Sequence, residues 1–288
     1  MNNMGLNNME NYKIRKLKDK IAYLACLSCA LIATVPLISI LIEVIKNGFP
    51  ALNIDFFTKP PGAVGEPGGG IANAIQGTLI LIGLTSLIGI PVGVLSGIFL
   101  AEFGDNNIGR LVRLSNNILA QFPSIVIGIF VYLVVVVPLG SFSPIAGAIS
   151  LSIIMIPIVA RTTEEALKLV PNTLREASMA LGVSRWRTII SIVLASARDG
   201  VVTGTLLSIA RIAGETAPLI MTILGSQWYF SGLNAPMDSL TLRIWRLALQ
   251  PYEYAHQQGW GAALVLILLV LFFNVSARVL TRSKYRRV

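Results

Sequence analysis

The stretch from Val201 to Leu224 reads VVTGTLLSIARIAGETAPLIMTIL, and it is long and apolar enough to cross a lipid bilayer. Arg211 and Glu215 lie near its middle. A charged side chain at bilayer depth costs about 3 kcal/mol on insertion scales, so it persists where it faces protein or water and has a partner. This pair is therefore the first candidate for a site that handles a charged solute inside a membrane.

The composition of the whole chain supports a membrane location. The 288 residues are 54% hydrophobic and only 13% charged, whereas soluble domains average about 25% charged residues. The formal net charge is +9, which in a soluble protein would suggest nucleic acid as a partner. Here the basic residues cluster in short loops and near both termini, so membrane topology explains them better.

Six stretches have the length and apolar character of spanning helices, which need about 20 mostly apolar residues. They are Ile21–Ile42, Leu79–Leu100, Ile118–Val137, Pro144–Ala160, Val201–Leu224 and Trp260–Ala277. The second could begin as early as Ile71, and the first is expected to be retained rather than removed as a signal peptide. The sequence therefore predicts an all-α integral membrane protein with six transmembrane helices.

The distribution of Lys and Arg predicts the orientation of these helices. Eighteen of the 23 basic residues precede the first span, follow the last, or lie in the loops after the second and fourth spans. By the positive-inside rule, both termini and these loops are cytoplasmic. We expect a multi-pass protein of the bacterial cytoplasmic membrane. Its predicted parts are a tail (1–20), the first helix with an outer Gly- and Pro-rich linker (21–70), a core (71–280) and a basic tail (281–288).

Two loops of the predicted core should have structure of their own. In the outer loop, 225–259, Asp238 could cap a short helix that Pro251 terminates, with Arg243 and Arg246 on an exposed polar face. In the cytoplasmic loop, 161–199, Pro171 can open one helix. Gly182 breaks that run, and a second helical piece follows from Ser184. The two short helices could project from the membrane as a knob, or they could be an inert linker at the membrane interface.

The cytoplasmic loop carries a motif that resembles a known family. Glu176-Ala177-Ser178, three residues, Gly182, nine residues and Ile192-Val193-Leu194-Ala195 are similar to the EAA loop of ABC importer permeases. Ser178 stands where that family has a third alanine, and Ala195 stands where it has a proline. The resemblance implies a type I ABC importer transmembrane fold, whose coupling helices insert into a separate ATPase subunit. It also implies ATPase-coupling roles for Glu176, Ala177, Ser178 and Gly182.

The chain has no Walker A motif of its own, because no Gly-Lys-Ser/Thr follows its glycine-rich segment. By the resemblance, ATP and Mg²⁺ would be bound and used by the partner ATPase. The chain itself is expected to be a transport subunit and not an enzyme, with no cofactor, no metal site and no catalytic residue.

Further blocks resemble, more specifically, the permease A branch of the phosphate ABC importers. These blocks are Gly68–Ile71, Arg161–Glu165, Arg175–Ala177, Arg211–Pro218 and Pro236–Leu240. The resemblance implies transport of inorganic phosphate. It also implies a complex with a second permease subunit, two ATPase subunits and an outer phosphate-binding protein, in contact with membrane lipid and without nucleic acid.

The fifth predicted span explains how an anion could be handled. If it is one helix, its polar residues fall near one face. They are Gly204, Ser208, Arg211, Glu215, Pro218 and Thr222. The predicted pathway residues are Arg211, Glu215, Ser208 and Thr222. An arginine can donate two hydrogen bonds to a phosphate, and Glu215 could hold Arg211 between transport events and ease release of the anion. The alternative role for the pair is a structural link between helices.

Two other readings of the function stay open at this point. The cargo could be another oxyanion, such as sulfate or molybdate, because arginine suits any of them. The chain could also be an ATP-independent secondary transporter or channel, with Arg211 and Glu215 as part of an ion relay. A membrane-embedded enzyme finds no support, because the sequence shows no histidine cluster, metal-ligand spacing or nucleophile motif.

Overall fold

The computed structural model describes residues 3–282 of the chain, and the part of the basic tail from 283 onward lies outside them. Within the described part the elements are helical and no strand forms. Four helices are long and apolar enough to cross a bilayer, and two bent helix pairs raise the number to six. This agrees with the predicted all-helical membrane protein.

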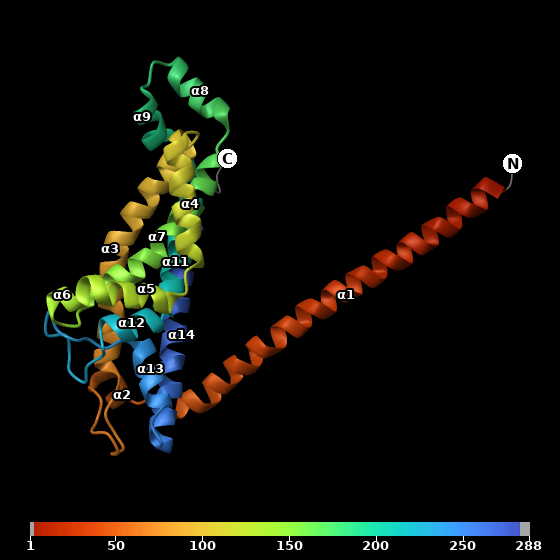
Figure 1. Cartoon of the computed structure of the whole chain (residues 1–288). Helices are drawn as coiled ribbons and strands as arrows, with labels where there is room; N and C mark the ends of the chain where they lie inside the picture. The colour runs from red at the N-terminus through yellow and green to blue at the C-terminus, as the bar shows by residue number, and fades with distance from the viewer. Residues whose placement is uncertain (1–2, 283–288) are drawn as a thin grey trace.

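The first helix, α1 (Asn3–Gly48), contains the predicted span Ile21–Ile42. It leaves the other helices at its C-terminal end and runs away from them (Figure 1). Only that end is packed: Val44 is buried, and Gly48 lies against Trp260 and Leu264 of α14 (Glu253–Arg282). The short elements η1 (Phe49–Ala51) and α2 (Ile54–Thr58) follow.

The centre of the bundle is the pair α3 (Ala72–Phe103) and α7 (Pro144–Lys168). Gly89, Gly93 and Gly97 of α3 face α7 so closely that an added Cβ would lie 2.9, 2.7 and 2.6 Å from its nearest atoms. Small residues allow membrane helices to approach in this way. The two helices therefore form a tight seam along their length.

The predicted span Ile118–Val137 is wrong as a single helix. The chain instead forms α4 (Asn107–Gln121) and α5 (Ser124–Val131), with a bend of 103° at Phe122 and Pro123. Proline lacks an N–H and disfavours helical backbone in the residue before it, so the helix ends there. After α5 come a π-helical turn, η2 (Tyr132–Val136), and the short α6 (Val137–Leu139).

The predicted span Val201–Leu224 is also discontinuous. It consists of α11 (Arg198–Ala213) and α12 (Ala217–Thr222), separated by Gly214, Glu215 and Thr216. Pro218 lies in the first turn of α12, where its missing N–H is tolerated, but it cannot donate back to Gly214 in a continuous helix. The break therefore falls beside the charged pair that the sequence singled out.

The loop that was predicted to be cytoplasmic contains the two predicted helices. They are α8 (Asn172–Ala180), which starts after Pro171, and α9 (Arg185–Thr188), which starts after Ser184. Gly182 makes the turn between them with a φ of +80°. The loop starts later than predicted, because α7 stays helical from Arg161 to Lys168. The π-helical η3 (Ile189–Val193) and α10 (Leu194–Ser196) connect α9 to α11 across a bend of 70°.

The remaining helix of the outer loop, α13 (Leu240–Ala248), packs between α14 and the start of α3. Figure 1 shows α2 and α13 at one end of the bundle and α8 and α9 at the other. We call these the outer end and the coupling end. The last helix, α14, is longer than the predicted span Trp260–Ala277 and covers 253–282.

Candidate transport site and coupling surface

The charged pair lies where the fifth span breaks. Arg211 is in the last turn of α11 and Glu215 is in the break, with Arg211 Nη2 and Glu215 Oε1 3.3 Å apart. The Arg211 side chain is 55% exposed, whereas that of Glu215 is 15% exposed. The backbone oxygen of Glu215 also accepts a hydrogen bond from Thr241 Oγ1 of α13 at 3.0 Å. The backbone of Glu215 is thus held by α13, and the exposed guanidinium is the member of the pair that can reach outward.

Irregular backbone at membrane depth is tolerated where it is buried in protein or lines an aqueous cavity. The pair is half exposed, so it lies between exposed pairs four residues apart, which are worth about 0.5 kcal/mol in water, and buried pairs, whose loss leaves a desolvated charge. An anion that draws Arg211 away must offset this cost at Glu215, which weakens anion binding and favours release. This arrangement can bind and release an oxyanion, although the pathway role of both residues stays a prediction.

The two hydroxyl residues of the predicted pathway lie elsewhere. Ser208 and Thr222 are buried, and their hydroxyls donate to the carbonyls of Thr205 (2.5 Å) and Pro218 (2.8 Å) in their own helices. The structure brings Arg211 and Glu215 together and leaves Ser208 and Thr222 in helix packing. Their predicted contact with the solute stays untested.

The small residues of the predicted polar stripe make close helix contacts. A Cβ on Gly204 would lie 2.2 Å from Thr162 Oγ1 of α7, and one on Gly128 of α5 would lie 2.7 Å from Pro218. The stripe is therefore not one open face. The break at 214–216 separates a part that packs on α7 from a part that packs on α5.

The coupling motif forms the tip of the coupling end. Glu176 and Ala177 of α8 are exposed, as is Gly182 in the turn. Ser178 is instead buried, and its hydroxyl lies 2.8 Å from that of Thr188 on α9. The serine that replaces the family's alanine therefore joins the two helices, and it does not face outward.

The residues on either side of Glu176 in the sequence include exposed apolar side chains. They are Leu174, Met179, Leu181 and Trp186, with Leu181 84% exposed. A cluster of exposed apolar side chains beside a charged residue is typical of a protein-binding surface. We call the exposed face of 174–186 the coupling surface.

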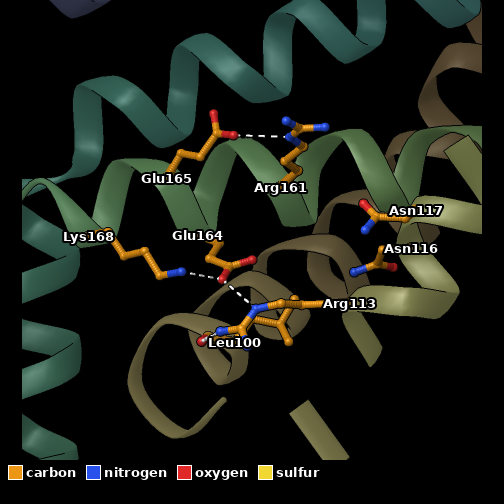
Figure 2. A pocket seen from close by; sticks show the side chains of 8 residues that line it. All are labelled: Leu100, Arg113, Asn116, Asn117, Arg161, Glu164, Glu165 and Lys168. Atoms are coloured by element: carbon orange, nitrogen blue, oxygen red, sulfur yellow. Dashed lines mark hydrogen bonds and ion pairs between the residues drawn. The ribbon is translucent and has the colours of Figure 1, made fainter. Parts of the chain in front are cut away.

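A polar cavity of about 220 Å³ lies behind the coupling surface, between α4 and α7. Figure 2 shows Glu164 at its centre, accepting hydrogen bonds from Arg113 Nε (2.9 Å) and Lys168 Nζ (2.6 Å). Arg161 and Glu165 form a second, exposed pair on the same helix. The two glutamates neutralise most of the charge of the three basic side chains that line the cavity, so we interpret it as a polar contact between helices. It explains why the 161–165 block has its two glutamates.

Sequence reasoning missed a buried ion pair at the outer end. Asp238 is fully buried and pairs with Arg243, which is 6% exposed, so the predicted exposed position of Arg243 is wrong. The predicted cap is also wrong, because Ser239 caps α13 by accepting from Leu242 N. Arg243 and Asn73 both donate to the carbonyl of Ser226. The sequence contained one signal for this pair, an aspartate that lies five residues before an arginine at the start of a helix.

Burial raises the pKa of the Asp238 carboxyl, although the neighbouring Arg243 guanidinium opposes that shift. Burial also lowers the pKa of Arg243, and Asp238 opposes this. Each group therefore depends on the other to remain charged. The pair is a structural lock that holds the 225–239 segment on the start of α3.

Comparison with known proteins identifies the family. A family model described as binding-protein-dependent transport system inner membrane component matches residues 89–288. A phosphate transport system permease protein PstA from Yersinia pestis is 41% identical, over 94% of this chain and 92% of its own length. The PstA of Haemophilus influenzae is 43% identical over 85% of the chain and 87% of its own length.

Solved structures support the fold. A bacterial alginate ABC transporter in complex with a pentasaccharide-bound periplasmic protein aligns with a TM-score of 0.65 at 19% identity. The alignment covers 92% of this chain and 96% of that one. An inward-facing MetNI methionine ABC transporter aligns with a TM-score of 0.61 at 21% identity, over 75% and 94% of the two chains. The chain therefore belongs to the binding-protein-dependent transport system inner membrane components, and within them to the PstA permeases.

Proposed function

We propose that this chain is the permease subunit of an ATP-driven importer that carries inorganic phosphate across the cytoplasmic membrane. The relatives named for phosphate transport support the cargo, because they match nearly the whole chain. The observation that carries the proposal is the Arg211–Glu215 pair at the break between α11 and α12. Arg211 is free to contact an anion there, and Glu215 is its counter-charge.

The energy source in this proposal is a separate ATPase that binds the coupling surface through Glu176 and the apolar side chains around it. ATP and Mg²⁺ would be bound by that ATPase. The whole complex would contain a second permease of the PstC type, two PstB-type ATPases and an outer PstS-type phosphate-binding protein. Both termini and the coupling end would face the cytoplasm, in agreement with the positive-inside rule.

The proposal is tested by phosphate uptake in proteoliposomes that contain the assembled complex. Arg211→Gln should lower uptake at least about tenfold, because one charge-assisted hydrogen bond is worth roughly 1.5–3 kcal/mol. Arg110→Gln is the matched control, since Arg110 is exposed on α4 and its side chain, within the described residues, bonds only to that of Asn107. Normal uptake by well-assembled Arg211→Gln would refute the role of this arginine.

The alternative cargoes and the alternative class are separated in the same assay. Arsenate should compete with phosphate, and sulfate and molybdate should not. Competition by sulfate at similar concentration would favour a broader oxyanion permease. Phosphate flux through this chain alone, without ATP or an ATPase, would instead favour a secondary transporter or channel.

A further inference from the structure

Three arginines from three different helices converge on the last turn of α3. Arg113 of α4 donates to the carbonyls of Leu100 (2.9 Å) and Gly104 (3.0 Å). Arg185 of α9 donates to the carbonyl of Glu102 at 2.6 Å, and its guanidinium lies 4.5 Å from the centre of the Phe103 ring. The third, Arg175 of α8, binds the Glu102 carboxylate.

Arg175 has the most contacts of the three. Its Nε and Nη2 donate to Glu102 Oε1 at 3.0 and 2.8 Å. Its Nη1 and Nη2 also donate to the carbonyls of Val170 (2.7 Å) and Leu167 (3.0 Å), at the end of α7. One guanidinium on α8 thus binds both helices of the central seam.

The Arg175–Glu102 pair is shielded from solvent. Its side chains are 16% and 7% exposed, whereas those of the pair between Arg161 and Glu165 at the same end are 73% and 63% exposed. Ion pairs that are mostly excluded from water are screened less and hold their geometry better than exposed ones. The pair is therefore suited to fix the position of α8 relative to α3.

Apolar packing supports one part of this joint and leaves another part open. A cavity of about 210 Å³ separates the coupling helices from the end of α3, and it is lined by Glu102, Arg175, Met179, Arg185, Thr188 and Ile189. The apolar core of this end includes Ile189 and Val193, which follow α9 in the chain. Beyond that core, polar contacts made by arginines hold the coupling helices.

We propose that Arg175 and Glu102 transmit the displacement of the coupling helices to the α3–α7 pair. Arg175 is a positioning residue in this mechanism, and the inference rests on the proposed coupling to a separate ATPase. The glycine seam makes α3 and α7 move as one body. Since α11 packs on α7 through Gly200 and Gly204, a shift of that body reaches the helix that carries Arg211.

A purely structural role for the pair makes a different prediction. If the pair only maintained the fold, its loss would reduce the amount of assembled complex and leave each assembled complex fully coupled. If the pair transmits motion, the ATPase still binds the coupling surface and hydrolyses ATP. Fewer phosphates are then moved per ATP. The ratio of ATP hydrolysed to phosphate transported therefore separates the two roles.

The experiment uses the complete complex in proteoliposomes, with the outer binding protein and phosphate supplied on one side. Arg175→Gln and Glu102→Gln are compared with Arg161→Gln, which removes an exposed pair at the same end. Glu102→Gln leaves the bonds from Arg175 to α7 in place, so it tests transmission even where Arg175→Gln assembles poorly. Co-purified ATPase, phosphate uptake and ATP hydrolysis are measured on each.

We expect both pair variants to retain ATPase within twofold of the unmodified complex, to lose at least fivefold in uptake, and to hydrolyse at least threefold more ATP per phosphate. Arg161→Gln should keep the normal ratio. An unchanged ratio in Glu102→Gln would overturn the inference. If the unmodified complex transports no phosphate or carries no ATPase, the proposed function fails instead.

Discussion

At the scale of residues, burial decides what each arginine–carboxylate pair does. Asp238–Arg243 is buried inside the protein and locks a loop, whereas Arg211–Glu215 has an exposed arginine beside a mostly buried carboxylate. Breaking a buried pair is far more costly than breaking an exposed one, because the remaining charge stays desolvated. The same two chemical groups therefore act as a lock in one place and as a candidate binding site in the other.

Asp238→Asn should destabilise the folded chain by about 3–5 kcal/mol, because Arg243 is left buried without its counter-charge. Thermal unfolding of the detergent-solubilised complex measures the effect. Asp55→Asn is the control, since the exposed Asp55–Lys59 pair should be worth less than about 1 kcal/mol. Equal unfolding temperatures for the two variants would contradict the structural lock.

Glu215→Gln should raise the affinity of the complex for phosphate and slow its release. The substitution removes the charge that competes with the anion for Arg211. We expect a lower KM and a lower maximal rate of uptake, with normal assembly. Uptake kinetics over a range of phosphate concentrations provide the measurement. A higher KM would mean that Glu215 contributes to anion binding in some other way.

The sequence predicted the residues of the charged pair but not the shape around them. Charged residues inside an apolar stretch can be recognised from the sequence alone, so Arg211 and Glu215 could be found. The break at Gly214 was missed because hydropathy registers the length of an apolar run and not its bends. The burial of Asp238 and Arg243 was missed because it depends on packing against α3, which lies far from α13 in the sequence.

At the scale of elements, the α3–α7 seam is the most extensive helix–helix contact in the described structure. Gly97 lies where an added Cβ would be 2.6 Å from the carbonyl oxygen of Ala160, which cannot rotate away. Gly83 of the same helix has no atom within 4 Å of the equivalent position. These two glycines therefore have opposite roles within one helix.

Gly97→Ala should destabilise the chain by roughly 1–3 kcal/mol, the usual range for overpacking. Gly83→Ala should be neutral or stabilise it by up to about 1 kcal/mol, because alanine is the better helix former. Thermal unfolding of the two variants side by side is the measurement. Comparable losses of stability in both would show that the seam does not limit the approach of α3 to α7.

Helix ends were more predictable than helix continuity. Pro171, Gly182 and Ser184 mark the coupling helices because caps and turns are local chemistry. The same local signals predicted too short a helix for α7. The Arg161–Lys168 segment is mostly polar, yet it remains helical through contacts with α3 and α4. Tertiary packing extended that helix beyond the apolar stretch.

At the scale of the whole molecule, the candidate transport site and the coupling surface lie on different parts of one helical body. The coupling surface is at one end, and α11 and α12 meet in the middle of the bundle (Figure 1). The sequence predicted this separation through the distribution of basic residues. It did not predict the arginines that hold the coupling helices on α3, because Arg175 and Arg185 reach a residue that is 73 and 83 positions away in the sequence.

Glu176→Lys should weaken the binding of the ATPase to the complex. The charge reversal lies on the exposed face of α8 and has no contact inside the described structure that would explain a loss of folding. We expect at least threefold less co-purified ATPase and a matching loss of uptake. Arg198→Gln, which alters an exposed residue at the start of α11, is the control. Full ATPase recovery with normal uptake would exclude Glu176 from docking.

The packing of α1 has a consequence for biogenesis. Its C-terminal end rests on α14, so α1 acquires this partner only when α14 has been made. At synthesis rates of about 5–20 residues/s, that delay is on the order of ten seconds or more. During this interval α1 must be kept in the membrane by lipid, by the insertion machinery or by another subunit, and premature termination before α14 would leave it permanently unpaired within the chain.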